Sequence, residues 1–253
     1  MAKQESFIKL QGKVGDLSFF KTKNGYQARV KGGVSPDRIK SDPAYQRTRE
    51  NNAEFATVSR SAKNIRDVLR PMILSTSDPK MATRLSSRLF RMIKVDTDSL
   101  RGQRKVTASS FGLLRDFNFN ESAPLNNTLF INVVPSIDRA TGVVELNVPE
   151  IIPQVHLGKP KAATHFRFTA GKALISLDQE MESSSLQLAL SGYEPITATL
   201  APMVLTSTLP ANAISPILLV FGISFYQEVN GVYYSLNNGA FNALCIVAVD
   251  TLS

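Results

Sequence analysis

The chain has 253 residues, of which 43% are hydrophobic and 20% charged, and a formal net charge of +8, a composition typical of a globular protein. Its longest nearly apolar run, from Ile214 to Phe225, is too short to span a bilayer and contains polar residues, which argues against a membrane protein. One cysteine, Cys245, excludes an intramolecular disulfide, and only two histidines, His156 and His165, disfavour a metal centre. The N-terminus lacks the apolar segment of a signal peptide, so we expect a cytoplasmic protein, with non-classical export left open.

The charge is distributed unevenly along the chain. Residues 1–115 contain 24 Lys and Arg against 10 Asp and Glu, whereas residues 116–253 contain 5 against 11. A strongly basic half indicates a nucleic acid, an anionic surface or an acidic protein as partner. The acidic half of a second copy of the same chain is one such partner, and charge alone leaves the choice open.

Residues 1–36 predict an N-terminal arm of short β-strands. Asn24-Gly25 separates two β-rich runs, which predicts a hairpin with a type I′ turn. Gly32-Gly33 ends this hairpin instead of opening a helix, so a phosphate-binding loop is disfavoured there. The candidate contact residues of the arm are its large apolar and aromatic side chains: Phe7, Leu10, Phe19, Phe20 and Tyr26.

Residues 37–109 predict two helices. Asp42-Pro43 and Ser77-Asp78-Pro79 are helix start signals, because an N-cap acceptor precedes a proline that needs no hydrogen-bond partner for its nitrogen. The first predicted helix ends before Pro71. Its apolar stripe comprises Phe55, Val58, Ala62, Ile65 and Leu69, and the stripe of the second comprises Met81, Leu85, Leu89, Met92 and Ile93. The stripes can pack against each other or against a sheet.

The outer faces of both predicted helices are basic. The candidate surface for self-association or for an anionic partner comprises Arg60, Lys63, Arg66 and Arg70 on the first helix and Lys80, Arg84, Arg88 and Arg91 on the second. The second set predicts one continuous ridge, because its spacing follows the helix period. Few aromatic residues lie among these cations and Trp is absent, which argues against a single-strand binder. We favour an acidic protein surface over nucleic acid, because the C-terminal half of the chain supplies such a surface.

Residues 110–253 predict an antiparallel β-sandwich, because short β-rich runs alternate with turn residues. Expected strands are Thr128–Val134, Val143–Val148, Thr164–Ala170, Leu174–Leu177, Ser185–Leu190, Val204–Thr208, Ile217–Gln227, Val232–Leu236 and Asn242–Val249. Gly171-Lys172 is interpreted as a turn, and Asn230-Gly231 as a second type I′ hairpin. The apolar run at Ala243–Val249 indicates a central strand buried on both faces. The predicted fold class is therefore α+β.

Catalytic motifs are absent from the sequence, which contains no nucleophile elbow, Walker loop, dinucleotide fingerprint or zinc-protease motif. Cys245 lies in an apolar strand and is interpreted as a core residue. His156, expected in a loop, and His165, expected at a strand start, have no Cys/His cluster nearby. Asp178, Glu180 and Glu182 are interpreted as a solvated acidic edge. We expect no enzyme, cofactor, metal or small-molecule substrate.

Both ends of the chain resemble a known family. The matching segments are Gly12–Lys21, Asn24–Tyr26, Arg29, Lys31–Val34, Asp42-Pro43, Gln46–Asn51, Glu54-Phe55, Phe221–Val232 and Asn238–Leu244. They resemble a family of largely uncharacterised Bacteroidota proteins that is similar to the cytoplasmic fibril protein of Saprospira. The resemblance implies a subunit of fibrous intracellular assemblies and transfers no catalytic residue.

These observations predict a non-enzymatic structural subunit that self-assembles into a filament, fibril or tube through head-to-tail contacts. Such contacts close into a ring or grow into a filament, depending on the rotation between copies. The arm either adds a strand to the sheet of the next copy or folds onto its own chain. The alternatives are a nucleic-acid-associated protein that binds phosphates through the basic helices, and a phage-derived tail or capsid subunit.

Overall fold

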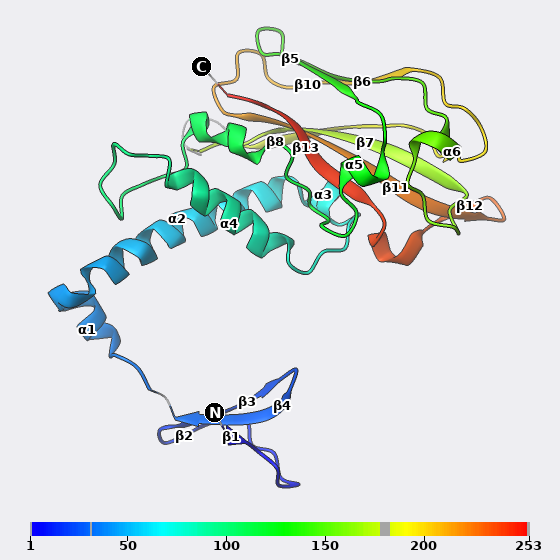
Figure 1. Cartoon of the computed structure of the whole chain (residues 1–253). Helices are drawn as coiled ribbons and strands as arrows, with labels where there is room; N and C mark the ends of the chain where they lie inside the picture. The colour runs from blue at the N-terminus through cyan, green and yellow to red at the C-terminus, as the bar shows by residue number, and fades with distance from the viewer. Residues whose placement is uncertain (1, 31, 178–182, 252–253) are drawn as a thin grey trace. The chain divides into compact units, whose positions relative to one another are not determined.

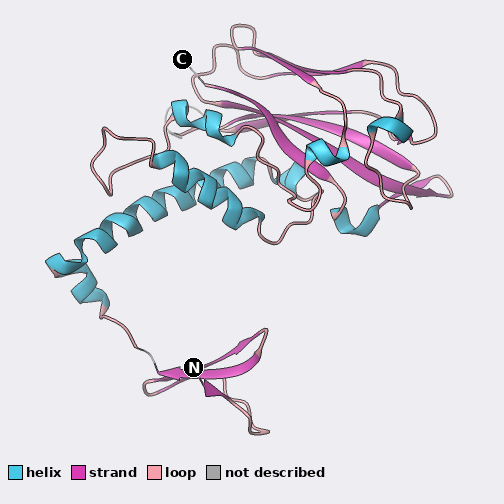
Figure 2. Ribbon diagram, in the orientation of Figure 1, coloured by secondary structure: helices cyan, strands magenta, loops and turns pink. Residues whose placement is uncertain are grey.

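The computed structural model describes residues 2–30, 32–177 and 183–251 and has the predicted α+β class. The chain divides into two compact units, residues 1–50 and residues 51–253. Figure 1 follows the chain from the N-terminal strands through the helices to the strand-rich C-terminal part, and Figure 2 distinguishes helices from strands. Within the described residues, no helix is both long enough and apolar enough to cross a bilayer.

The first unit contains a four-stranded antiparallel sheet with the order β1-β4-β3-β2. Its strands are β1 (Ala2–Lys3), β2 (Gly12–Val14), β3 (Leu17–Thr22) and β4 (Gly25–Val30). The predicted β3–β4 hairpin is confirmed, but its predicted turn type is wrong. Thr22 pairs with Gly25, and the positive φ of 99° belongs to Gly25 and not to Asn24. A type I′ turn needs positive φ at both central residues, which Lys23 and Asn24 do not supply.

Side-chain caps explain where the first helical segments begin. The Ser35 hydroxyl accepts from the Arg38 amide at 3.3 Å and starts α1 (Pro36–Ser41). A carboxylate oxygen of Asp42 accepts from the Ala44 amide at 2.9 Å and starts the 3₁₀ turn η1 (Pro43–Tyr45), which leads into α2 (Gln46–Val68). The start signal at Asp42 is therefore confirmed, and the caps satisfy amides that would otherwise lack partners.

The helices of the second unit bury most of their predicted stripes. They are the rest of α2, α3 (Arg70–Ile73) and α4 (Met81–Ile93). The predicted α4 stripe is buried throughout, and α2 ends before Pro71 as predicted. Phe55 is the exception, since it is 59% exposed. All three helices share one hydrophobic core with the larger sheet of this unit, so the stripes of α2 and α4 contribute to a core between the helices and this sheet.

Two antiparallel sheets form the C-terminal part, as the sandwich prediction requires. The larger has the order β12-β11-β7-β8, with β13 beside β11 and β9 beside β7, and the smaller has the order β10-β6-β5. The strands are β5 (Val134–Asp138), β6 (Val143–Val148), β7 (His165–Leu174), β8 (Ser185–Leu190), β9 (Glu194–Pro195), β10 (Met203–Thr208), β11 (Ile217–Val229), β12 (Val232–Ser235) and β13 (Ala243–Asp250). Short helical segments are η2 (Ala108–Leu114), α5 (Leu125–Thr128), α6 (Pro153–His156) and η3 (Leu236–Gly239).

The larger sheet has a hydrophobic core on each face. Along β11, Leu218 and Val220 belong to the core shared with the helices, whereas Leu219 and Phe221 belong to the core shared with the smaller sheet. Alternation of side chains along a strand produces this division. The second unit therefore has three layers, with helices, larger sheet and smaller sheet in that order (Figure 1).

Two predicted strand boundaries are wrong for identifiable reasons. The segment predicted as strand Thr128–Val134 begins with the last residue of the helix α5, in which the Thr128 hydroxyl donates to the Pro124 carbonyl at 2.9 Å. The strand β5 begins only at Val134. The predicted turn at Gly171-Lys172 is instead the interior of β7. A Cβ at Gly171 would lie 2.1 Å from the Met72 sulfur, so this glycine allows α3 to approach the sheet closely.

The strand β13 is buried on both faces over residues 243–246, as predicted, but it is not central, contrary to its prediction. It pairs with β11 on one side, while the segment around Phe117–Phe119 follows its other side. The Phe119 amide donates to the Leu244 carbonyl at 2.7 Å, and the Ile246 amide donates to the Phe117 carbonyl at 3.1 Å. This segment covers part of the sheet edge, which explains why an edge strand has such an apolar sequence.

Candidate functional site

The N-terminal sheet has one apolar face. The strand registers place Leu17 opposite Val30, Phe19 opposite Ala28, and Val14 opposite Leu17, so all these side chains share a face. We call this set, Val14, Leu17, Phe19, Ala28 and Val30, the N-terminal apolar face. Val14 is 63% exposed and Val30 66% exposed.

The opposite face of the same sheet is polar and basic. Arg29 lies 5.3 Å from the centre of the Phe20 ring, and Lys13 shares this face. Tyr26 lies on the side of the apolar face, with the Lys21 ammonium 5.4 Å from its ring centre. The predicted arm residues Phe19 and Tyr26 are therefore brought together, whereas Phe20 lies on the other face.

The loop before β2 presents the remaining predicted arm residues. The Gln4 side chain accepts from the Leu10 amide at 2.8 Å and donates to the Leu10 carbonyl at 3.2 Å, which closes the loop. Phe7 lies in this loop and is 94% exposed. None of the described residues of the first unit is buried, so this unit has no hydrophobic core of its own.

The predicted basic residues of α2 and α3 are exposed or half-buried, and some already have partners. Lys63 forms an ion pair with Asp67 at 2.7 Å, and the Arg66 Nε donates to the Ala62 carbonyl at 3.2 Å. Arg60 donates to the Thr57 hydroxyl at 3.4 Å, and Arg70 is exposed. The first basic face is thus partly neutralised within the helix.

Arg84 interrupts the ridge predicted on α4, where Lys80 is exposed at the N-terminal end. The Arg84 guanidinium forms ion pairs with Asp78 and with Glu121, the latter at 3.6 Å. It also stacks over the Phe117 ring, with 5.2 Å to the ring centre. Burial alone would raise the pKa of Asp78, but hydrogen bonds from Arg84 and from backbone amides lower it below its usual value. Arg84 therefore acts as a structural cation whose charge is compensated.

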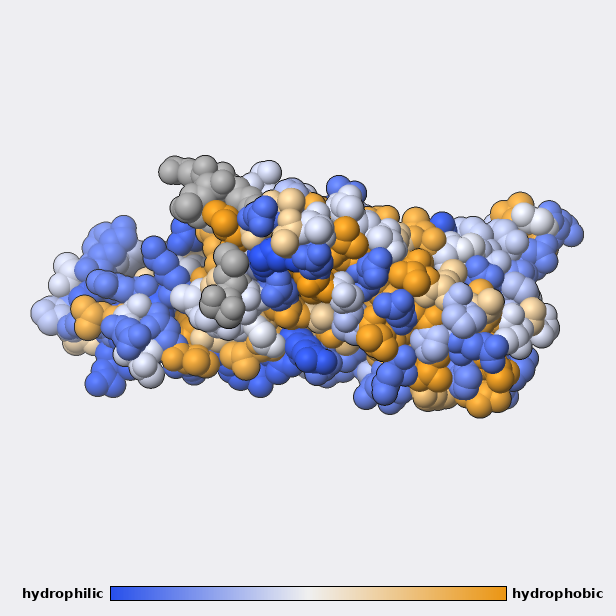
Figure 3. Space-filling model, turned by 90° about the horizontal axis from the view of Figure 1, so that it is seen from above, coloured by the Kyte–Doolittle hydropathy of each residue, from blue (hydrophilic) through white to orange (hydrophobic). Residues whose placement is uncertain are grey.

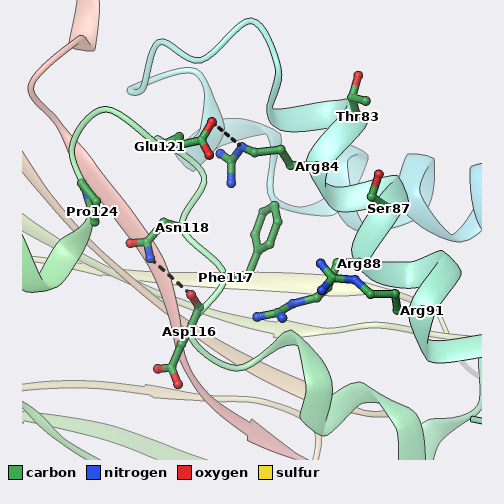
Figure 4. A pocket seen from close by; sticks show the side chains of 10 residues that line it. All are labelled: Thr83, Arg84, Ser87, Arg88, Arg91, Asp116, Phe117, Asn118, Glu121 and Pro124. Atoms are coloured by element: carbon green, nitrogen blue, oxygen red, sulfur yellow. Dashed lines mark hydrogen bonds and ion pairs between the residues drawn. The ribbon is translucent and has the colours of Figure 1, made fainter.

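A hollow of about 390 Å³ lies between α4 and the segment that follows β13's edge (Figure 4). We call it the α4 hollow; it is lined by Thr83, Arg84, Ser87, Arg88, Arg91, Asp116, Phe117, Asn118, Glu121 and Pro124. Arg88 makes one long hydrogen bond, from Nη2 to the Arg115 carbonyl at 3.4 Å. Among the described residues, no carboxylate forms an ion pair with Arg88 or Arg91.

Sequence reasoning did not identify Lys172, which is completely buried inside the sandwich. Its ammonium donates to the Leu205 carbonyl at 2.9 Å. Burial lowers the pKa of Lys172 to about 8, and the charge of Glu145 opposes this effect. The burial of Lys172 could not be predicted from the sequence, because Gly171-Lys172 has the composition of a turn. Only the pairing of β7 with β11 places the Lys172 side chain in the core.

The other candidate residues take structural positions. Cys245 is buried, and burial, assisted by the charge of Asp116, raises the pKa of its thiol to about 12. His156 ends α6, contrary to the predicted loop, and its Nδ1 accepts from the Ile152 amide at 3.0 Å; His165 begins β7 as predicted. Asp178, Glu180 and Glu182 lie outside the described residues. Among those that are described, no group of three or more His, Cys, Asp or Glu could hold a metal ion.

Comparisons of the chain with protein-family models, curated proteins and solved structures find no match.

Proposed function

We propose that this protein is a structural subunit that assembles with copies of itself, and that the N-terminal apolar face of one copy docks on the second unit of another. The observation that carries this proposal is an amphipathic sheet in a unit none of whose described residues is buried. A small isolated sheet is marginally stable in water, because it cannot bury enough apolar surface. A partner surface that covers the face supplies the missing burial.

The gain from covering this face is substantial. Val14, Leu17 and Val30 are 63%, 41% and 66% exposed. Complete burial of an exposed aliphatic side chain contributes about 1.5–3 kcal/mol, so partial burial of these three contributes roughly 3–5 kcal/mol. Part of this gain offsets the entropy lost on association, and repetition of the contact along a polymer adds to the stability of each subunit.

The smaller sheet of the second unit offers a complementary surface. Val144, Leu146 and Leu205 are buried on its inner side, so the alternate residues of its strands point outward. We call these the outer sheet face: Val134, Ser136, Asp138, Val143, Glu145, Asn147, Val204, Thr206 and Thr208. Figure 3 views this side of the molecule and shows hydrophobic patches among hydrophilic residues.

Charge favours a match between these two surfaces. The outer sheet face contains carboxylates but no Lys or Arg, whereas residues 1–50 contain 11 Lys and Arg against 5 Asp and Glu. Opposite charges around an apolar contact orient the partners and disfavour pairing of like surfaces. The two surfaces differ, so the contact is heterologous and repeats into a ring or a filament.

Docking through a face is favoured over strand addition. The hairpin strands β3 and β4 both have neighbours on each side, which leaves β1 and β2 as the edges of the N-terminal sheet. These edge strands have only 2 and 3 residues. Such short edges offer few backbone hydrogen bonds to a neighbouring sheet.

The test is a pair of charge substitutions in the full chain, Leu17→Lys with Val30→Lys, which face each other across β3 and β4. The matched control is Val95→Lys with Leu100→Lys, at positions that are 64% and 72% exposed in the second unit. Negative-stain microscopy and light scattering of nuclease-treated protein should show polymers for the wild type and the control, and small particles for the first variant. Polymers of both variants would refute the docking proposal.

The same samples show whether the assembled protein contains nucleic acid. A ratio of absorbance at 260 and 280 nm typical of protein, measured on assembled wild type, is expected from the proposal. Assembly that occurs only after DNA or RNA is returned would refute the self-assembly proposal and favour the nucleic-acid-associated function.

A further inference from the structure

Arg88 and Arg91 are the cations of the α4 hollow that have no counter-ion among the described residues. They lie three residues apart on α4, so both side chains project from the same side of the helix (Figure 4). Arg84, one turn earlier, is neutralised by Asp78 and Glu121. The hollow therefore contains two positive charges that the described part of the protein does not compensate and that a bound anion would pair with.

The carboxylates on the lining do not fill this role. Glu121 is turned toward Arg84, and Asp116 directs its carboxylate away from both arginines in Figure 4. Asp116 also lines a second hollow together with Cys245, and its charge acts on that thiol. The part of the α4 hollow that contains Arg88 and Arg91 is thus accessible to a ligand.

We propose that the α4 hollow binds the phosphate group of a small phosphate monoester. Guanidinium groups form paired, charge-assisted hydrogen bonds with phosphate oxygens, and two of them match a dianion better than the single charge of a carboxylate. Thr83 and Ser87 also line the hollow, and neither makes a side-chain hydrogen bond within the described residues. A tetrahedral anion accepts from several directions at once.

The organic part of the ligand is apolar or aromatic. A neighbouring hollow of about 690 Å³ shares Thr83, Ser87 and Arg91 with the first. Its other lining includes Phe55 and Phe90, and Phe55 is the stripe residue that remains 59% exposed. A ligand whose phosphate lies on the arginines can place its organic group against these rings, where burial of apolar surface favours binding.

This inference concerns a different surface from the self-assembly proposal and does not depend on it. The probe is phenyl phosphate, titrated into the full chain by calorimetry at constant ionic strength, with inorganic phosphate and benzoate as comparisons. The principal variant is Arg88→Gln with Arg91→Gln. The matched control is Arg60→Gln with Lys63→Gln, which removes the same charge from the outer face of α2. A third variant, Phe55→Ser, tests the aromatic contact.

We expect phenyl phosphate to bind most tightly, inorganic phosphate more weakly and benzoate weakest. The variant in the hollow should lower the affinity for phenyl phosphate at least about tenfold, because each hydrogen bond to a charged group contributes more than 1 kcal/mol. The control should change it less than about twofold. Phe55→Ser should weaken phenyl phosphate and leave inorganic phosphate unchanged.

Unchanged affinity in the Arg88/Arg91 variant, an equal loss in the control, or benzoate binding as tightly as phenyl phosphate would each overturn the proposal. So would the absence of any binding of phenyl phosphate to wild type. An oligonucleotide that binds through Arg88 and Arg91 while phenyl phosphate fails to compete would assign the hollow to nucleic acid instead. Circular dichroism of every variant establishes that the fold is retained.

Discussion

Replacing Lys172 with methionine should stabilise the protein at neutral pH. The lysine lies inside the sandwich with no exposed surface, and its ammonium has one backbone acceptor, the Leu205 carbonyl. Methionine has a similar length and no charge, so it fills the same space without the cost of burying a cation. This substitution therefore separates the packing role of the side chain from its electrostatic cost.

The magnitude follows from the pKa of Lys172, which burial lowers from 10.5 to about 8. This difference corresponds to about 3 kcal/mol of unfavourable free energy below pH 8. Loss of the hydrogen bond to Leu205 costs about 1 kcal/mol, which leaves a net gain of about 2 kcal/mol at pH 7. Between the two pKa values the unfolded chain binds the proton and the folded chain does not, so wild-type stability rises with pH there. The advantage of Lys172→Met should shrink by about 1 kcal/mol from pH 7 to pH 9.

Urea unfolding at pH 7 and pH 9 measures both effects, with wild type and variant compared at each pH. Lys161→Met, which removes an exposed lysine, is the control and should show neither the gain nor its pH dependence. A Lys172→Met protein that is less stable than wild type at pH 7, with a difference that does not change by pH 9, would refute the argument. That result would mean that the ammonium is better solvated by the fold than its burial indicates.

The other predictions concern a tight turn, an ionic contact and the thiol. Gly142→Ala should destabilise the protein by about 3 kcal/mol in urea unfolding, because φ is +76° there and the new Cβ would lie 2.1 Å from the Leu209 carbonyl oxygen; a change below 1 kcal/mol would contradict this. Arg139→Met should cost about 2 kcal/mol, because Arg139 pairs with Asp250 at 2.7 Å and is only 16% exposed, and an unchanged thermal midpoint would contradict it. Cys245 should resist a disulfide reagent at pH 8 in the native state and react on unfolding, because burial raises the pKa of its thiol to about 12; rapid native labelling would show that the strand opens locally.

Local patterns predicted the elements whose partners lie nearby or whose periodicity is strong. The α4 stripe is buried as expected because a helix with one apolar side has only one stable orientation on a sheet. The hairpin at Asn230-Gly231 has positive φ at both residues, as its sequence predicts. Phe55 shows the limit of such patterns, because an apolar residue in register with a stripe is buried only if an element lies opposite it.

The sequence by itself determined the α+β class, the order of hairpin, helices and strands, and the separation of basic from acidic residues along the chain. These properties depend on local geometry and composition. Only the tertiary structure decided which charges remain uncompensated, because Arg84 finds Glu121 far along the chain whereas Arg88 and Arg91 find no carboxylate among the described residues. It also decided that Lys172 is buried. Electrostatic energies depend on distance and solvent exposure, and both arise only when remote segments come together.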